Sequence, residues 1–187
     1  MFSPISTFLM LPQKSCAVGR DMLILGVDPG TVNLGYGIVD GEEEMHMVDC
    51  GVINVSSRVP MEERLRSLYD RLSQIIANHR PSEVAIEDPF IGRNVRSAFA
   101  IGRAQAIAIL AAANKGLPVY YYSPARIKQQ ITGYGQSDKQ QIQEMVRIQL
   151  GLTELPQPSD AADALAVAIC HIQQSRLNRW LIEHAPK

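Results

Sequence analysis

Apolar and polar residues follow one another along the chain in blocks that predict three early strands. Residues 22–27 form a continuous apolar run that ends at Asp28-Pro29-Gly30, a pattern typical of a buried strand that enters a tight turn. Residues 34–40 and 45–55 follow after short connections and also have the composition of strands. Because short connections between consecutive strands favour antiparallel pairing, we expect a three-stranded meander.

The remainder of the chain predicts helices that alternate with short strands. Helices are predicted at residues 60–79, 95–113, 125–131, 138–150 and 159–173, and strands at 83–87 and 118–122. We expect helix 95–113 to be buried because it is rich in alanine. Ser123-Pro124 is a typical start for the third helix, and Ser137 with Gln140 forms a capping-box pattern before the fourth. Together these elements predict one mixed α/β sheet flanked by helices.

Length and composition fit one domain with a substantial apolar core. The chain has 187 residues, of which 46% are hydrophobic. No run approaches the roughly 20 consecutive apolar residues that a membrane-spanning helix needs, so no membrane association is expected. Residues 1–21 lack the charge-first order of a secretory signal and are treated as an N-terminal extension. We therefore place the domain at residues 22–174 and a C-terminal tail at 175–187.

Cysteine content and charge narrow the class of protein further. Cys16, Cys50 and Cys170 are odd in number and widely spaced, which argues against a disulfide framework or a zinc site and favours a reducing cytoplasm. The net charge is −1, yet residues 88–150 hold eight Lys/Arg against three Asp/Glu, and residues 40–87 hold five against ten. This asymmetry fits either ordinary solvated charge or a basic face for nucleic acid.

Two carboxylates stand at the ends of predicted strands. Asp28 ends the first strand and Glu87 ends the strand 83–87. Asp is common in turns, so Asp28 alone could be a turn residue. An acid at the end of a buried strand is costly without a partner, and a salt bridge would satisfy Glu87 as well as a metal would. Asp88 points to the other side of the extended chain from Glu87 and is excluded from the site.

Two further carboxylates open the last predicted helix. Asp160 and Asp163 are three residues apart and therefore project from one face. One acid in a first turn is explained by the helix dipole, but two on a largely apolar helix need a shared positive counterion. Four carboxylates without useful His or Cys suit Mg²⁺ or Mn²⁺. Two such ions about 4 Å apart support hydrolysis of a phosphodiester, which makes a nuclease the favoured class.

Groups that could hold phosphate or bases lie in the basic half of the chain. Lys128 is on the third predicted helix and Lys139 is at the start of the fourth, and each could equally be a solvated lysine. Phe90 lies in a loop with Arg93 and Arg96. An aromatic residue in a basic, Gly/Pro-containing loop is either a core anchor or a stacking group for unpaired bases.

An ordered set of motifs resembles the RuvC family of Holliday-junction resolvases. The matching segments are 24–31 (ILGVDPGT), 35–37 (GYG), 85–87 (AIE) with Phe90, 102–104 (GRA), 118–120 (PVY), 127–129 (IKQ), 133–135 (GYG), Lys139, 145–147 (MVR), and 161–166 (AADALA) with His171. The resemblance covers roughly residues 22–174 in order, and the full set is far more specific than any one segment.

The resemblance implies roles for the residues already singled out. It identifies Asp28, Glu87, Asp160 and Asp163 as the catalytic acids that bind Mg²⁺, with two ions per subunit and Mn²⁺ as a substitute. The position of Asp160 is His in some relatives. Lys128 and Lys139 match lysines that contact the DNA backbone, and Phe90 matches an aromatic that stacks at the junction core, with Arg93 and Arg96 beside it. The family implies an RNase H-like fold, a homodimer that cuts four-way DNA junctions symmetrically, and the partners RuvA and RuvB.

Other classes share parts of this pattern. The loop at residues 26–31 also fits the first phosphate loop of actin-like ATPases and sugar kinases, but that fold needs a second domain that 187 residues cannot hold. A non-catalytic junction-binding module would not require four acids. An RNase H-like nuclease that cuts RNA–DNA hybrids is the closest chemical alternative, and Phe90 with the two lysines favours the resolvase.

Overall fold

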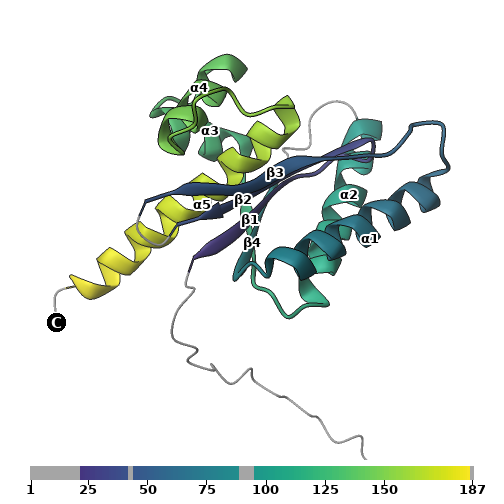
Figure 1. Ribbon diagram of the computed structural model, residues 1–187, viewed down its shortest axis with the longest axis horizontal. Coiled ribbons are helices and arrows are strands. Elements are labelled where there is room, and N and C mark those ends of the chain that lie inside the picture. Colours follow the sequence, from purple (N-terminus) through teal and green to yellow (C-terminus); the bar gives the residue numbers. More distant parts are fainter. Residues whose placement is uncertain (1–21, 42–43, 89–94, 186–187) are drawn as a thin grey trace, which may run out of the picture.

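The computed structural model describes residues 22–41, 44–88 and 95–185, which form one mixed sheet with helices on both faces (Figure 1). The five strands are β1 (Leu23–Asp28), β2 (Asn33–Asp40), β3 (His46–Asn54), β4 (Glu83–Glu87) and β5 (Val119–Tyr122). The five helices are α1 (Met61–His79), α2 (Val95–Ala113), α3 (Pro124–Thr132), α4 (Lys139–Gln149) and α5 (Ser159–Glu183).

The strands lie in the order β3-β2-β1-β4-β5. The first three pair antiparallel, as the short connections predicted, while β4 pairs parallel to β1 and β5 parallel to β4. Val27 of β1 is in register with Ile86 of β4. Because parallel neighbours end at the same edge, the last residues of β1 and β4 lie side by side.

Alternate residues of the central strands enter two separate cores. Leu25, Val27 and Ile86 pack in one core with the buried side chains of α1 and α2. Ile24 and Ala85 pack in the other with α5 and with buried residues of α3 and α4. Figure 1 shows the same division, with α1 and α2 on one side of the sheet and α3, α4 and α5 on the other. A strand buried on both faces is expected to be apolar throughout, and the run at 22–27 fits this.

Glycines bring α5 into direct contact with β1 and β2. An added Cβ at Gly26 would lie 2.1 Å from the backbone oxygen of Ala164, and one at Gly35 would lie 2.1 Å from that of Asp160. Real Cβ atoms do not approach that closely, so only glycine permits this packing. The approach holds the first turns of α5 beside the end of β1.

Three details differ from the prediction. Helix α2 is not buried on all sides as expected. Its buried alanines face the core, but its opposite face is exposed to solvent and carries Phe99, which is 66% exposed. The capping box of α4 is made by Asp138 and Gln141 and not by Ser137 and Gln140. Helix α5 was predicted to end at Gln173 but continues to Glu183, so most of the segment assigned as a C-terminal tail is helical.

Other expectations agree with the structure or fall outside it. Ser123 caps α3 by accepting a hydrogen bond from the Arg126 N–H at 3.3 Å, and Pro124 is the first helical residue, as predicted. Within the described ranges, no helix combines the length and apolar character needed to cross a membrane. The N-terminal extension at residues 1–21 lies outside the described residues.

Candidate active site

Asp28 and Glu87 are the last residues of two neighbouring parallel strands. Their predecessors, Val27 and Ile86, are paired in register. Residues at the same level of a sheet point to the same face, so the two carboxylates leave β1 and β4 on one side. Both are partly buried, because α5 covers this face.

Asp160 and Asp163 reach the same place from the start of α5. Carboxylate oxygens of Asp28, Asp160 and Asp163 all lie within 4.8 Å of one another. The exposed N–H groups of a first turn favour acids, so the helix tolerates Asp160 there. The fold therefore brings Asp28 together with two acids that follow it by more than 130 residues in the sequence.

Burial and the crowding of acids make ionisation of Asp28 costly. Burial, followed by the charges of Glu87, Asp163 and Asp160, raises the pKa of Asp28 to about 7, and Lys139 opposes the rise. Burial and the Asp163 charge also raise the pKa of Glu87, while Lys128 and Lys139 act in the opposite direction. These shifts have the sign expected for carboxylates that share too little positive charge.

Two lysines face the acids from α3 and α4. Lys139 Nζ lies 2.7 Å from Asp163 Oδ2, and this hydrogen bond raises the pKa of Lys139. The Asp138 cap makes Lys139 the first residue of α4 and so positions its backbone. Lys128 is on α3, and its charge acts on Glu87. A pocket of about 210 Å³ lies between the acids and the lysines and is lined by Glu87, Pro124, Ile127, Lys128, Lys139, Ile142, Asp163 and Ala166.

The donor set fits a hard divalent cation. The three clustered acids offer only oxygen ligands, which Mg²⁺, Mn²⁺ and Ca²⁺ prefer and zinc sites rarely use alone. The pKa of Asp28, raised first by burial and then by the neighbouring acids, points the same way, because a bound cation would favour the ionised carboxylate. Glu87 is adjacent, on the pocket wall, and could complete the set.

The structure thus brings together the four predicted acids and the two predicted lysines. Phe90 and Arg93 lie outside the described residues, and of Arg96 only its backbone, in α2, is described. Asp88 is exposed and accepts a hydrogen bond from Gln105 at 3.0 Å, outside the acidic group. The apolar walls, Ile127 and Ile142, were not singled out from the sequence, since nothing distinguishes them from other core residues of amphipathic helices.

Comparisons with known proteins agree with this geometry. Residues 24–171 match the family model described as crossover junction endodeoxyribonuclease RuvC. The protein of that name from Dehalococcoides mccartyi is 52% identical over 154 residues, covering 82% of this chain and 92% of the relative. The one from Pelotomaculum thermopropionicum is 49% identical over 161 residues, covering 86% and 98%.

Solved structures give the same result. A structure of Thermus thermophilus RuvC in complex with a Holliday junction substrate aligns with a TM-score of 0.79 and 36% identity, over 84% of this chain and 96% of that one. The yeast mitochondrial Holliday junction resolvase Ydc2 aligns with a TM-score of 0.61 at 13% identity, over 88% and 86% of the two chains, which bears on the fold alone. The RNase H-like fold and the family resemblance predicted from the sequence are both confirmed.

Proposed function

The chain belongs to the RuvC family of crossover junction endodeoxyribonucleases, and we propose that it resolves four-way DNA junctions by metal-dependent phosphodiester hydrolysis. The observation that carries the proposal is the convergence of Asp28, Asp160 and Asp163 within 4.8 Å. Glu87 and two lysines line the adjoining pocket. With metal ions bound, these groups suit phosphodiester hydrolysis, because that reaction needs charge neutralisation and little covalent chemistry from the protein.

The acids are proposed as the ligands of divalent metal ions. Asp28, Asp160 and Asp163 would hold one ion, and Glu87 with Asp28 would contribute to a second. We propose Mg²⁺ as the natural ion, two per subunit, with Mn²⁺ as a substitute, because all the donors are hard oxygen atoms. When bound, such ions make water more acidic and neutralise the charge that builds up on the phosphate oxygens.

The protein's own cations would hold the phosphate. Lys139 is half exposed, with 54% of its side chain accessible, and its ammonium group already reaches the acids. Lys128 stands beside it on the pocket wall. An ammonium group is a compact charge suited to a phosphate oxygen. We propose that both lysines contact the backbone of the cleaved strand and that Lys139 then leaves Asp163 free for metal.

The resemblance supplies the finer parts of the proposal. Phe90 is proposed to stack on bases at the junction core, with Arg93 and Arg96 contacting DNA nearby. A homodimer would bring two such sites to two strands of the junction, so that cuts are paired and symmetric. RuvA and RuvB are the proposed partners, and the cytoplasm the proposed compartment. The Thermus thermophilus RuvC of known structure was solved with a Holliday junction, which supports the choice of substrate.

A junction-cleavage assay tests the function. Purified protein with Mg²⁺ is incubated with a synthetic four-way junction, the linear duplex of the same sequence, and an RNA–DNA hybrid. We expect paired cuts in the junction only, and binding without cutting by Asp28→Asn. Phe90→Ala should reduce cleavage more than binding. Equal cutting of linear duplex or of the hybrid would overturn the junction assignment.

A further inference from the structure

We propose that Tyr134, in the loop between α3 and α4, stacks on a nucleotide of the bound junction close to the cleaved phosphate. The inference rests on the proposed function and adds to it a contact residue outside the acidic site. Tyr134 is 78% exposed, among the highest values for a large hydrophobic side chain in the described part of the chain. Exposure alone means little, since many apolar side chains reach the surface. The exposure of Tyr134 is informative because of the loop that carries it.

Hydrogen bonds fix both the backbone N–H and the backbone C=O of Tyr134, while its side chain is exposed to solvent. Its N–H donates to Thr132 Oγ1 at 3.2 Å, and its carbonyl accepts from Ser137 Oγ at 3.0 Å. The Thr132 and Ser137 hydroxyls are themselves 2.5 Å apart, and Ser137 is buried. Gly133 ends α3 with a φ of +78°, a value that suits glycine. A ring held out on an anchored loop has already lost part of the freedom that binding would otherwise remove.

The loop connects the two lysines that are proposed to hold the cleaved strand. Thr132 lies one helical turn after Lys128, whose carbonyl is 2.8 Å from Thr132 Oγ1. Lys139 follows Tyr134 by five residues, which span at most about 17 Å of extended chain. Stacked nucleotides are about 3.4 Å apart along a strand. Tyr134 is therefore within about five nucleotides of the phosphate that Lys139 would contact.

A groove beside the ring has the right chemistry for nucleotides. It measures about 490 Å³ and is lined by Thr132, Tyr134, Gln136, Ser137, Gln141 and Met145. None of these residues carries a negative charge that would repel a strand. Two acids lie near it: Asp138 caps α4 and accepts a hydrogen bond from Gln141 N at 2.8 Å, and Glu144 is paired with Arg147 at 2.6 Å. An aromatic face with neutral donors and acceptors beside it is typical of sites that stack bases with little sequence preference.

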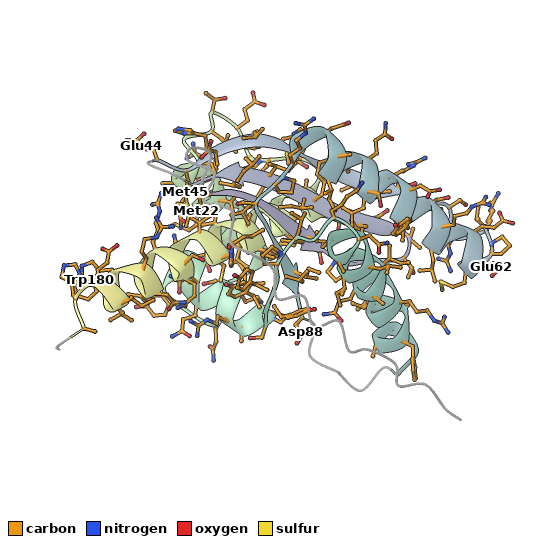
Figure 2. All side chains as sticks on the ribbon, turned by 90° about the horizontal axis from the view of Figure 1, so that it is seen from below. Met22, Glu44, Met45, Glu62, Asp88 and Trp180 are labelled. Atoms are coloured by element: carbon orange, nitrogen blue, oxygen red, sulfur yellow. The ribbon has the colours of Figure 1, made fainter. Side chains whose placement is uncertain are left out.

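Binding of a labelled junction in EDTA, where no cleavage occurs, measures the contact. Tyr134→Ala should weaken the affinity roughly tenfold, the size expected for one lost base–aromatic stack. Tyr134→Phe should bind like the unmodified protein, since the ring is retained. Trp180→Ala is the matched control, because Trp180 is an aromatic residue with similar exposure, 55%, at the free end of α5 (Figure 2). Its affinity should not change, and thermal unfolding of all three variants should match the unmodified protein.

Abasic nucleotides, placed one at a time on either side of the cut, locate the contact. If Tyr134 stacks on a base, removal of that base weakens binding by the unmodified protein but has no further effect on Tyr134→Ala. Additive effects at every position, or unchanged affinity of Tyr134→Ala, would overturn the inference. If either of these two results is found while junction cleavage is normal, the inference about Tyr134 fails but the proposed function still holds. If the unmodified protein neither binds nor cuts the junction, the proposed function itself fails. Unchanged DNA affinity together with lost binding of a protein partner would assign Tyr134 to that partner instead.

Discussion

Lys139 Nζ and Asp163 Oδ2 are 2.7 Å apart, which places an ammonium group of α4 directly on an acid of α5. The pair closes one side of the pocket that Glu87 and Lys128 also line. Because Lys139 is half exposed, solvent screens the pair and its effect on folding is small. The position of the contact, beside the acidic group, is what gives it importance for phosphate binding.

Replacing this ammonium group should affect cleavage far more than stability. Lys139→Met keeps the aliphatic stem and removes the charge, so the pocket loses one of two cations that would stabilise phosphate. We expect the cleavage rate of a bound junction to fall about 100-fold, as when one stabilising group of a transition state is lost. Single-turnover cleavage with saturating protein measures this, and thermal unfolding without metal measures stability.

Lys115→Met is the matched control for the lysine prediction. Lys115 is an exposed lysine in the turn after α2, away from the acidic pocket. Its loss removes the same charge but no group near the acids, so cleavage should stay within about twofold. A similar fall for both variants would mean that net charge, and not the contact with the cleaved strand, is responsible.

The raised pKa of Asp28 predicts how stability varies with pH when no metal is present. Burial and the surrounding acids raise this pKa from 3.8 to about 7. Between these values the folded protein binds a proton that the unfolded chain has lost, so folding stability falls as the pH rises from about 4 through 7. The loss is at most on the order of 4 kcal/mol.

Urea unfolding in EDTA at pH 4 and pH 8 measures this loss. Asp28→Asn cannot ionise, so it should be more stable than the unmodified protein at pH 8 and close to it at pH 4. Mg²⁺ at pH 8 should stabilise the unmodified protein and have little effect on the variant, because ligand binding to the folded state adds to stability. A pH dependence that is the same in both proteins would show that Asp28 does not carry the shift.

The geometry of the site depends on a glycine in a neighbouring strand. A Cβ at Gly35 would lie 2.1 Å from the backbone oxygen of Asp160, so Gly35→Ala must push the start of α5 away from β2. This would separate Asp160 from Asp28. We expect a loss of about 3 kcal/mol in stability and of nearly all cleavage activity, because overpacking at a rigid contact is costly.

Gly102→Ala provides the contrast for the glycine prediction. Gly102 is an exposed residue of helix α2, and a Cβ there would meet nothing within 4 Å. Alanine is favoured over glycine in a helix, so this variant should gain about 0.5–1 kcal/mol and cut junctions normally. Urea unfolding and junction cleavage compare the two. Normal cleavage by Gly35→Ala would show that the acids do not depend on this packing.

Local sequence patterns were enough to predict the elements and to single out the four acids as candidates. The apolar run before Asp28, the strand before Glu87 and the spacing of Asp160 and Asp163 each determine which residue stands at the end of an element. The antiparallel pairing of the first three strands, and a mixed sheet flanked by helices, follow from the same patterns and from short connections, whereas the order of the strands was not predicted.

Contacts between distant segments were not predictable in this way. Ser137 and Asp138 are each followed three residues later by glutamine, and the cap position is decided by Ser137 bonding to Thr132 and Tyr134. The ion pair of Lys139 with Asp163 joins two helices whose packing no local pattern reveals. Helix α5 extends past Gln173 with exposed leucine and tryptophan, where an apolar pattern toward the core is no longer present.

A buried histidine ties α5 to the sheet, and its carboxylate partner Glu83 lies at the end of β4 opposite Glu87. His171 Nε2 lies 2.6 Å from Glu83 Oε2 and its Nδ1 lies 2.7 Å from the Tyr122 hydroxyl, so one ring joins α5 to β4 and β5. His171 is 1% exposed. Its removal leaves a cavity and deprives the buried Tyr122 hydroxyl of its partner, while Glu83, which is 30% exposed, loses its shortest hydrogen bond, so His171→Ala should destabilise the fold by about 3 kcal/mol. Cleavage at low temperature should persist, since Glu83 and Glu87 lie at opposite ends of β4.

The pH dependence of the stability lost in His171→Ala distinguishes the contribution of the His171–Glu83 hydrogen bond from that of side-chain packing. The bond from His171 lowers the pKa of Glu83 below its ordinary 4.5. A lowered carboxylate pKa stabilises the fold above 4.5, and this contribution disappears as the pH falls through the folded-state pKa. The stability difference between the unmodified protein and His171→Ala should therefore shrink below about pH 4.5. Urea unfolding from pH 3 to 7 measures it, with Tyr122→Phe as the control, because this variant loses the other bond and keeps Glu83 paired. A difference that stays constant with pH would assign the whole effect to the cavity left by the ring.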